Sequence, residues 1–312
     1  MKHAPIALFV YNRPIHTQST LDALASNYLA NESELFIFSD GSKEDEANIS
    51  LVVQVRKIIE AEQRFAAVHL HYNQNNKGLA DSILSGVTFL LTKFSKIIVL
   101  EDDLITNKTF LKYMNQGLNL YSKVDKVMSV SGHSFTSSKI SQKNGSYFLP
   151  YMSSWGWGTW DSSWRKFDKH ADQYTILKTN KKLRKKFNLS GSYNYSELLY
   201  DQMETNKVDS WAIRWWWTIF MEQGVSLFPD RSLVRNIGFD DSGTHTLGLD
   251  ITQNGPKEDY EIINFPEKIK VRKSTFSEVK KIIKSEFHQK IKGYSFFQKS
   301  IDKVKFELKR YL

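Results

Sequence analysis

The hydrophobic residues of the first 131 positions fall into short continuous runs that alternate with segments of helical spacing. The runs are rich in β-branched and aromatic side chains, which is typical of strands buried on both faces of a parallel sheet. Strands are expected at residues 5–11, 34–39, 68–72, 97–100 and 126–131, and helices at residues 17–28, 44–65, 77–94 and 107–121. This repeated alternation with short links predicts a doubly wound, mostly parallel α/β sheet with helices on both faces.

The alternation ends after residue 131, where tryptophan becomes frequent. All eight Trp residues lie between positions 155 and 217. They occur in the segments YMSSWGWGTWDSSW (151–164) and DSWAIRWWWTIF (209–220). One more strand is expected at residues 225–228. The sequence shows no internal repeat and no low-complexity linker.

Three acids directly follow the strand expected at residues 97–100. They are Glu101, Asp102 and Asp103, within KIIVLEDDLITNKTFLKYM. In open α/β sheets ligands bind at the carboxyl ends of strands, and grouped carboxylates there suit a hard divalent cation that also binds phosphate oxygens. The alternative is that the acids simply end a strand, and the three residues alone do not separate the two interpretations.

The tryptophans also allow two interpretations. Flat aromatic faces stack on sugar rings, and neighbouring glycines let the backbone approach a ligand, which favours a carbohydrate or nucleotide site. Trp155 and Trp157, beside Gly156 and Gly158, are expected to face a ligand. Residues 215–217 are three consecutive Trp on an expected helix, and they are assigned to the core.

Four further polar residues are candidates for chemistry or binding. Asp209 precedes an expected helix start, so it is either an N-cap or a general base for an acceptor hydroxyl. His245, in a Gly-Thr-His turn, is either an ordinary loop histidine or a contact to a metal or a phosphate. Arg13 and Asp40 follow the first two strands, and they either bind a nucleobase or pair as surface charges.

The net charge is concentrated in the C-terminal segment. Residues 267–312 carry 14 Lys/Arg and 5 Asp/Glu, whereas the preceding residues carry 29 of each, so this tail accounts for the whole formal charge of +9. A uniformly basic nucleic-acid-binding protein does not have this distribution, so no nucleic-acid partner is expected. Apolar residues recur at spacings of three and four between the lysines. This predicts a basic amphipathic helical appendage that either binds an anionic membrane surface or packs on the rest of the protein.

The 312 residues include no cysteine, which excludes disulfides, thiolate zinc sites and a cysteine nucleophile. Any metal must therefore be bound by oxygen or imidazole. No apolar run reaches the roughly 20 residues that a membrane-spanning helix needs, and the N-terminus has no signal-peptide pattern. A cytoplasmic protein is expected.

Taken in order, four segments resemble the GT-A nucleotide-sugar glycosyltransferases, in particular N-acetylglucosaminyltransferase I and related bacterial polysaccharide glycosyltransferases. The segments are IIVLEDDLITNKTFLKYM (97–114), SSWGWGTW (153–160), DSWAIRW (209–215) and NIGFDDSGTH (236–245). The resemblance implies a GT-A catalytic domain at residues 1–266. Its nucleotide-binding half would be residues 1–125 and its acceptor-side half residues 126–266, with the helical tail at residues 267–312.

The resemblance implies roles for the residues of the nucleotide-binding half. Glu101, Asp102 and Asp103 correspond to the family's DxD-type motif. Asp103 would bind a Mn²⁺ or Mg²⁺ ion that bridges the donor diphosphate, and Asp102 would lie near the donor ribose or sugar. Arg13 and Asp40 match positions that hold the uracil of a UDP-sugar.

The resemblance also implies roles in the acceptor-side half. Residues 155–160, with Trp155, Gly156 and Trp157, match a loop that contacts the acceptor and the donor sugar. Asp209 matches the catalytic base, although a serine follows it where the family usually has a second acid. His245 matches a segment that closes over the diphosphate, as a ligand of the metal or the diphosphate.

The expected function is therefore a metal-dependent, inverting glycosyltransferase of bacterial surface polysaccharide synthesis. It would move a hexosyl or N-acetylhexosaminyl group from a nucleotide-sugar to a glycan or lipid-linked saccharide. The enzyme would be either free in the cytoplasm or peripheral at the inner face of the plasma membrane. One alternative is a nucleotidyltransferase acting on sugar phosphates, but the first strand is followed by YNRPIHTQ and not by a glycine-rich phosphate loop. A non-catalytic carbohydrate-binding module is the other alternative, and only the density of Trp favours it.

Overall fold

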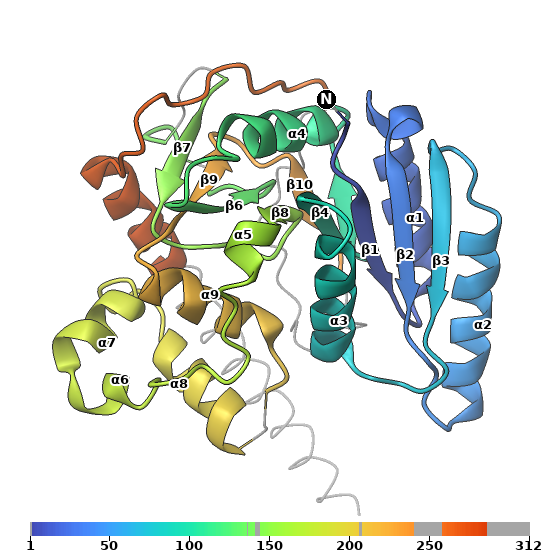
Figure 1. Cartoon of the computed structure of the whole chain (residues 1–312), viewed down its shortest axis with the longest axis horizontal. Coiled ribbons are helices and arrows are strands. Elements are labelled where there is room, and N and C mark those ends of the chain that lie inside the picture. The colour runs from blue at the N-terminus through green and yellow to red at the C-terminus, as the bar shows by residue number, and fades with distance from the viewer. Residues whose placement is uncertain (1, 136, 141–143, 206–207, 240–257, 286–312) are drawn as a thin grey trace, which may run out of the picture.

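The computed structural model describes residues 2–135, 137–140, 144–205, 208–239 and 258–285. Within these residues the centre of the molecule is a sheet of eight strands in the order β3-β2-β1-β4-β8-β6-β9-β7 (Figure 1). The strands are β1 (Ile6–Val10), β2 (Glu34–Ser39), β3 (Ala67–Tyr72), β4 (Lys96–Glu101), β6 (Val127–Ser131), β7 (Ser146–Leu149), β8 (Trp157–Trp160) and β9 (Val225–Pro229). A separate two-stranded ribbon joins β5 (Leu104–Thr106) to β10 (Val234–Asn236).

Nine named helices accompany these strands in the described part of the chain. They are α1 (Pro14–Ala25), α2 (Glu46–Glu60), α3 (Leu79–Leu91), α4 (Phe110–Leu120), α5 (Asp161–Trp164), α6 (Ile176–Thr179), α7 (Lys181–Phe187), α8 (Tyr195–Tyr200) and α9 (Trp211–Met221). The first four connect successive strands, whereas α5 to α9 lie between β8 and β9 in the sequence. Residues 273–285 form a further helix.

Each face of the sheet is covered by its own set of helices. Ala7 and Phe9 of β1 belong to the apolar cluster that includes residues of α3, α5 and α9, whereas Ile6, Leu8 and Val10 belong to the cluster with α1, α2 and α4. Figure 1 shows α1 and α3 on opposite faces. Alternate residues of a strand point to opposite faces, so both faces of a doubly covered strand must be apolar. The predicted doubly wound α/β sheet is confirmed.

Six of the eight strands run in one direction, and β7 and β8 run against them. β1 pairs in parallel with β2 and β4, and β6 pairs in parallel with β9. β8 pairs antiparallel with both β4 and β6, so β4 and β6 point the same way. The carboxyl ends of β1, β2, β4 and β6 therefore meet at one edge of the sheet.

The central position of β8 was not expected from the sequence. The ligand loop predicted at residues 155–160 is in large part this strand, and Gly158 allows it to fit, because a Cβ there would lie 2.8 Å from the carbonyl oxygen of Ile97. The prediction that Trp157 faces a ligand is wrong. Its side chain is 1% exposed, and its ring stacks on Trp211 with centroids 4.9 Å apart.

The assignment of residues 215–217 to the core is confirmed. These three Trp side chains on α9 are buried, as is Trp211 at its start, and Trp215 packs against Trp157 and Trp164. The tryptophan-rich segments thus mainly build the core between the sheet and the helices α5 to α9.

The described part of the basic tail packs on the protein. Val279 and Ile283 of the helix at residues 273–285 are buried in the same apolar cluster as Phe187 of α7. The ammonium group of Lys280 donates to the hydroxyl of Ser190, just after α7, at 3.2 Å. Of the two alternatives for the tail, packing on the domain applies to this helix, and residues 286–312 lie outside the described residues. Among the helices that the structure describes, each is too short or too polar to cross a bilayer.

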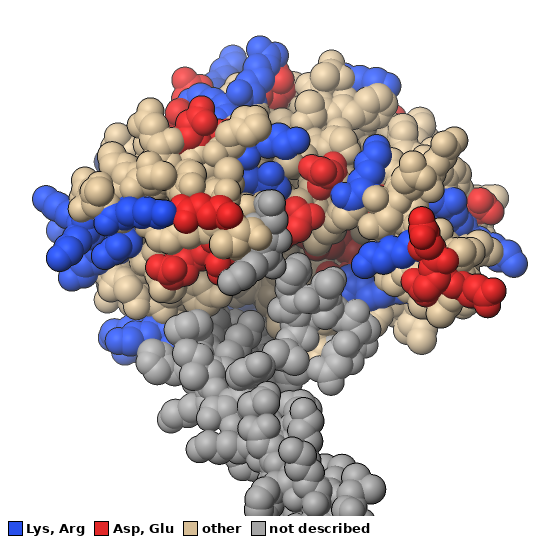
Figure 2. Space-filling view, turned by 90° about the horizontal axis from the view of Figure 1, so that it is seen from below, with Lys and Arg blue, Asp and Glu red and all other residues tan. Residues whose placement is uncertain are grey.

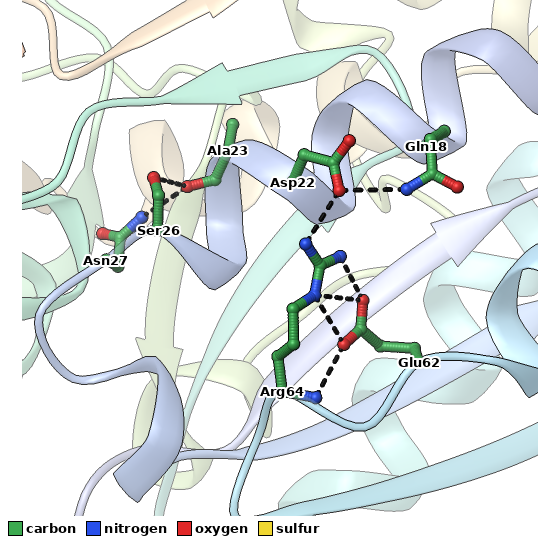
Figure 3. Close-up of polar contacts among 7 residues, drawn as sticks. All are labelled: Gln18, Asp22, Ala23, Ser26, Asn27, Glu62 and Arg64. Carbon is green, nitrogen blue, oxygen red and sulfur yellow. Dashed lines mark hydrogen bonds and ion pairs between the residues drawn. The ribbon is translucent and has the colours of Figure 1, made fainter.

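A charge network that satisfies both oxygens of the buried Glu62 lies near the amino ends of the strands (Figure 3). Arg64, which precedes β3, donates to both carboxylate oxygens of Glu62 and, at 2.8 Å, to the carboxylate of Asp22 on α1. Gln18 donates to the same oxygen of Asp22 at 2.9 Å. Burial acts to raise the pKa of Glu62, but hydrogen bonds and the charge of Arg64 outweigh it, so this pKa is lowered. The network joins α1 to the connection between α2 and β3.

Candidate active site

The carboxyl ends of the parallel strands place most of the predicted site residues at one edge of the sheet. Arg13 follows β1, Asp40 follows β2, and the acidic triplet 101–103 ends β4 and continues beyond it. His133, which was not singled out from the sequence, follows β6. Figure 2 views the molecule from this side, where acidic and basic side chains surround the centre and the basic residues of α7 gather at the left.

Arg13 pairs with the acids that follow β4. Its guanidinium donates to the carboxylate of Asp102 and, at 3.1 Å, to Oδ2 of Asp103. β1 lies directly beside β4 in the sheet, which brings the ends of the two strands together. The sequence left open whether Arg13 and Asp40 pair as surface charges. In the structure Arg13 instead forms partly buried ion pairs with Asp102 and Asp103. Uracil binding by Arg13 stays a prediction.

One oxygen of this cluster has no partner. Asp103 is 8% exposed, and its Oδ1 makes no hydrogen bond among the described residues. Asp102 is 3% exposed, and besides Arg13 it accepts a hydrogen bond from the backbone N–H of Tyr11 at 3.4 Å. A buried carboxylate oxygen without a donor is costly in a protein interior, which makes Asp103 the natural place for an added cation.

Burial and the neighbouring acids raise the pKa values of Glu101 and Asp102. Burial is the main cause that raises the pKa of Glu101 to about 8, and the charges of Asp103 and Asp102 add to it. Burial also raises the pKa of Asp102 to about 6, although Arg13 opposes the shift. A group of acids with raised pKa values at a strand end is characteristic of sites built to hold a positive charge.

The ribbon of β5 and β10 closes one side of the cluster. The backbone N–H of Ile237 donates to the carbonyl oxygen of Asp103 at 2.8 Å. Gly238 follows, and a Cβ at this position would clash with the Asp103 carboxylate and lie 3.0 Å from a guanidinium nitrogen of Arg13. A larger residue at this position would require the side chains of Asp103 and Arg13 to shift. The sequence pointed to the segment through NIGFDDSGTH but not to the glycine itself.

The acidic cluster after β4 supplies part of what a metal site needs. Hard divalent cations prefer carboxylate oxygens, and the unpartnered Oδ1 of Asp103 is such an oxygen. Within the described residues, however, no group of three His, Asp or Glu side chains is arranged to hold an ion alone. Any ion here would need further oxygen ligands, such as those of a diphosphate or water.

Asp209 lies at the same edge as the acids. The link is the hydrogen bond between Glu101 and Trp211, the first residue of α9. Ser210 is the N-cap of α9, since its hydroxyl accepts from the N–H of Ile213 at 3.3 Å, so the interpretation of Asp209 as the N-cap is wrong. The Asp209 side chain is 58% exposed and lies 3.9 Å from the guanidinium of Arg214.

Asp40 organises the loop that precedes α3. Its carboxylate accepts hydrogen bonds from the side chains of Asn73 and Asn76 and from the backbone N–H groups of Lys77 and Gly78, at 3.0–3.2 Å. The side chain is 6% exposed. These contacts satisfy the Asp40 carboxylate within the protein, and its role in uracil binding stays a prediction.

Trp155 remains a candidate for ligand contact. It is partly exposed and packs edge-to-face on His133 and Phe239, with centroids 4.7 and 5.7 Å away. Gly156 adopts a left-handed φ of +58°, and a Cβ there would lie 3.0 Å from Val234, so close packing explains this glycine. Its predicted ligand contact stays a prediction.

Two histidines need separate mention. His133 is buried, which lowers its pKa to about 4, so this imidazole is neutral at physiological pH. Its Nδ1 lies 3.3 Å from the hydroxyl of Ser153. His245 lies outside the described residues, and its predicted role remains a prediction.

Solved structures with partial similarity include two glycosyltransferase structures. The crystal structure of S. aureus TarS aligns at 14% identity over 53% of this chain and 30% of that chain, with a TM-score of 0.34. The structure of GalNAc-T7 with UDP, GalNAc and Mn²⁺ aligns at 12% identity over 75% of this chain and 44% of that chain, with a TM-score of 0.44. The chain thus spans less than half the length of either protein. These low TM-scores do not establish a shared fold or activity.

No known protein family matches the sequence, and no curated protein matches it.

Proposed function

We propose that the protein is a glycosyltransferase that transfers a sugar from a nucleotide-sugar donor to a hydroxyl group of a saccharide. The observation that carries this proposal is the acidic cluster after β4, where a buried oxygen of Asp103 has no hydrogen-bond partner among the described residues, at the edge that also carries Asp209. Neither a carbohydrate-binding module nor a structural domain needs a buried carboxylate oxygen without a partner at a strand end. The motif order that resembles GT-A enzymes supports the same reaction.

In this proposal the donor diphosphate binds beside the acids that follow β4. Asp103 would hold a Mn²⁺ or Mg²⁺ ion together with the diphosphate oxygens, and such an ion neutralises charge on the departing nucleotide. Arg13, already placed between Asp102 and Asp103, supplies a second positive charge at the same place. The half-exposed Trp155 offers an aromatic face for a sugar ring near this end.

Asp209 serves as the general base. Its side chain is 58% exposed, so the carboxylate can accept the proton of an acceptor hydroxyl as that oxygen attacks the anomeric carbon. The bond from the anomeric carbon to the diphosphate oxygen breaks as the new glycosidic bond forms, and the diphosphate leaves with the bonding electrons. A single displacement inverts the anomeric configuration. The donor is proposed to be a UDP-linked hexose or N-acetylhexosamine.

The basic surface of α7 supports a finer proposal about the acceptor. Lys181, Lys182, Lys185 and Lys186 are exposed, and the helix at residues 273–285 packs beside the end of α7. Such a surface attracts anionic lipid, as an enzyme extending a lipid-linked saccharide would require. Flotation with vesicles containing anionic lipid should fall when the four lysines are changed to Glu, and unchanged flotation would remove the membrane surface from the proposal.

The reaction is tested by presenting purified protein with a panel of nucleotide sugars, with Mn²⁺ or with EDTA. A cognate donor should raise the melting temperature only with the metal and should be hydrolysed slowly to the nucleoside diphosphate. If sugar phosphates and nucleoside triphosphates are the compounds that react, the protein is a nucleotidyltransferase. If saccharides bind but no nucleotide sugar binds or is hydrolysed, the glycosyltransferase proposal fails.

A further inference from the structure

Arg214 is a buried cation next to the proposed base. It lies on α9, its side chain is 7% exposed, and its Nε donates to the carbonyl oxygen of Ser210 at 3.3 Å. Burial lowers the pKa of Arg214, and the charges of Asp209 and Asp81 oppose that effect. Arginine is rarely buried, because removing its charge from water costs free energy unless a partner offsets it.

The ion pair between Arg214 and Asp209 stabilises the fold too little to offset the cost of burying the Arg214 guanidinium. The ion pair with Asp209 has an N···O distance of 3.9 Å, and the Asp209 side chain is 58% exposed. An ion pair with one exposed partner typically offsets less free energy than the burial of a guanidinium costs. Arg214 therefore interacts with one oxygen of Asp209 from the protein interior, while much of the Asp209 side chain stays exposed to solvent.

The backbone at Gly78 also lies close to the Asp209 carboxylate. Gly78 precedes α3 with a φ of +79°, and a Cβ at this residue would lie 3.2 Å from Oδ2 of Asp209. The carboxylate thus lies between the amino end of α3 and the guanidinium of Arg214. Arg214 on one side and the backbone at Gly78 on the other leave this carboxylate less room to rotate than a fully exposed aspartate has.

We propose that Arg214 is a positioning residue that fixes the orientation of the Asp209 carboxylate for proton transfer. The inference rests on the proposed role of Asp209 as the base. A base acts only when its oxygen is within hydrogen-bond reach of the proton, and small displacements of a catalytic group reduce turnover strongly. Arg214 itself touches neither donor nor acceptor in this account.

The test compares Arg214→Gln, Arg214→Lys and the control Asp81→Asn. Asp81 is the other acid that interacts with Arg214, but it is exposed on α3 and lies 4.0 Å from Lys169. Arg214→Gln should lower kcat by about 10- to 100-fold and leave the donor KM unchanged. Arg214→Lys should recover part of the loss, because it retains the charge, and Asp81→Asn should keep the wild-type kcat. Circular dichroism verifies that each variant is folded.

A double substitution separates a positioning role from a structural one. If Arg214 acts through Asp209, adding Arg214→Gln to Asp209→Asn should cause no further loss of kcat. A multiplied loss in the double variant, or a wild-type kcat in folded Arg214→Gln, would overturn the inference. If Asp209→Asn alone retains near-normal turnover, the proposed base is wrong, and that result is distinct from a failure of Arg214.

Discussion

Two arginines at opposite edges of the sheet are each paired with two acids, but the pairs differ in how completely they are satisfied. At the amino ends, Arg64 binds Glu62 and Asp22, and the pKa of Glu62 is lowered. At the carboxyl ends, Arg13 binds Asp102 and Asp103, yet within the described part of the chain Oδ1 of Asp103 accepts no hydrogen bond.

The pKa values of the acids differ between the two clusters in the same way as their hydrogen bonding. The pKa of Asp102 is raised to about 6 and that of Glu101 to about 8, so one arginine does not balance the acids after β4. A cluster that only stabilises the fold can have all its charges paired, whereas a cluster that binds a cation must retain negative charge for it. Both clusters have one arginine and two paired acids. Incomplete hydrogen bonding of a buried carboxylate, and not the number of charged residues, therefore distinguishes the candidate binding site from the structural ion pair.

The largest effect is expected at the proposed base. Asp209→Asn removes the proton acceptor and retains the shape of the side chain, so turnover should fall by about two to four orders of magnitude. Nucleotide affinity should remain nearly unchanged, because the acids after β4 are intact. Steady-state kinetics with the cognate donor provides the measurement, and near-normal turnover of the folded variant would exclude the base.

The next effect concerns the close approach of β10 to the acids. Gly238→Ala places a Cβ against the Asp103 carboxylate and Arg13, and such overpacking should weaken UDP binding about tenfold. Gly86→Ala is a matched control, because its Cβ would lie 2.7 Å from the Phe9 ring in the core. The control should lower the melting temperature and not the UDP affinity. Equal UDP affinities of the two variants would show that the approach of Gly238 does not matter.

The third prediction concerns how the free energy of unfolding of the protein depends on pH. A carboxyl group with a raised pKa retains its proton in the folded protein after the unfolded chain has lost it. For Glu101, the free energy of unfolding should therefore fall as the pH rises from about 4.5 towards 8, by at most about 1.4 kcal/mol per pH unit. Urea unfolding should show a shallower dependence for Glu101→Gln, and an unchanged slope would contradict the raised pKa.

The smallest effect is expected at the amino-end cluster. Arg64→Met leaves Glu62 without its partner and should lower the free energy of unfolding by about 1–2 kcal/mol. Because the pKa of Glu62 is lowered, its stabilisation is present above its ordinary pKa and is lost as the pH falls below it. Donor binding and turnover should remain at wild-type values. A loss of activity in this variant would break the contrast between the two edges.

Most of the sheet could be predicted from the sequence because its signals are local. Strand β2 was expected at residues 34–39 and occurs at Glu34–Ser39, and the strand with the acids at its end was located within one residue of β4. Continuous β-branched and aromatic runs carry this information without knowledge of distant contacts. Strand β8 was missed because glycine and tryptophan alternate there without a recognisable strand pattern.

The site could be predicted only as a set of residues near strand ends. The pairing of Arg13 with Asp102 and Asp103 depends on β1 lying beside β4, and the order of strands is not contained in the hydrophobic pattern. The approach of Gly238 depends on the pairing of β5 with β10, which are far apart in the chain. Local patterns can place an acid at a strand end, but only the assembled sheet determines whether its oxygens are satisfied, as at Asp40, or not, as at Asp103.

Calorimetric titration with UDP, in Mn²⁺ and in EDTA, tests the central claim most directly. The unpartnered oxygen of Asp103 should make UDP binding dependent on the metal, and Asp103→Ala should abolish that dependence without unfolding the protein. The account predicts binding heat for the wild type in Mn²⁺ only, and none for the variant in either buffer. Equal UDP affinity with and without the metal, or retained metal-dependent binding in Asp103→Ala, would contradict it.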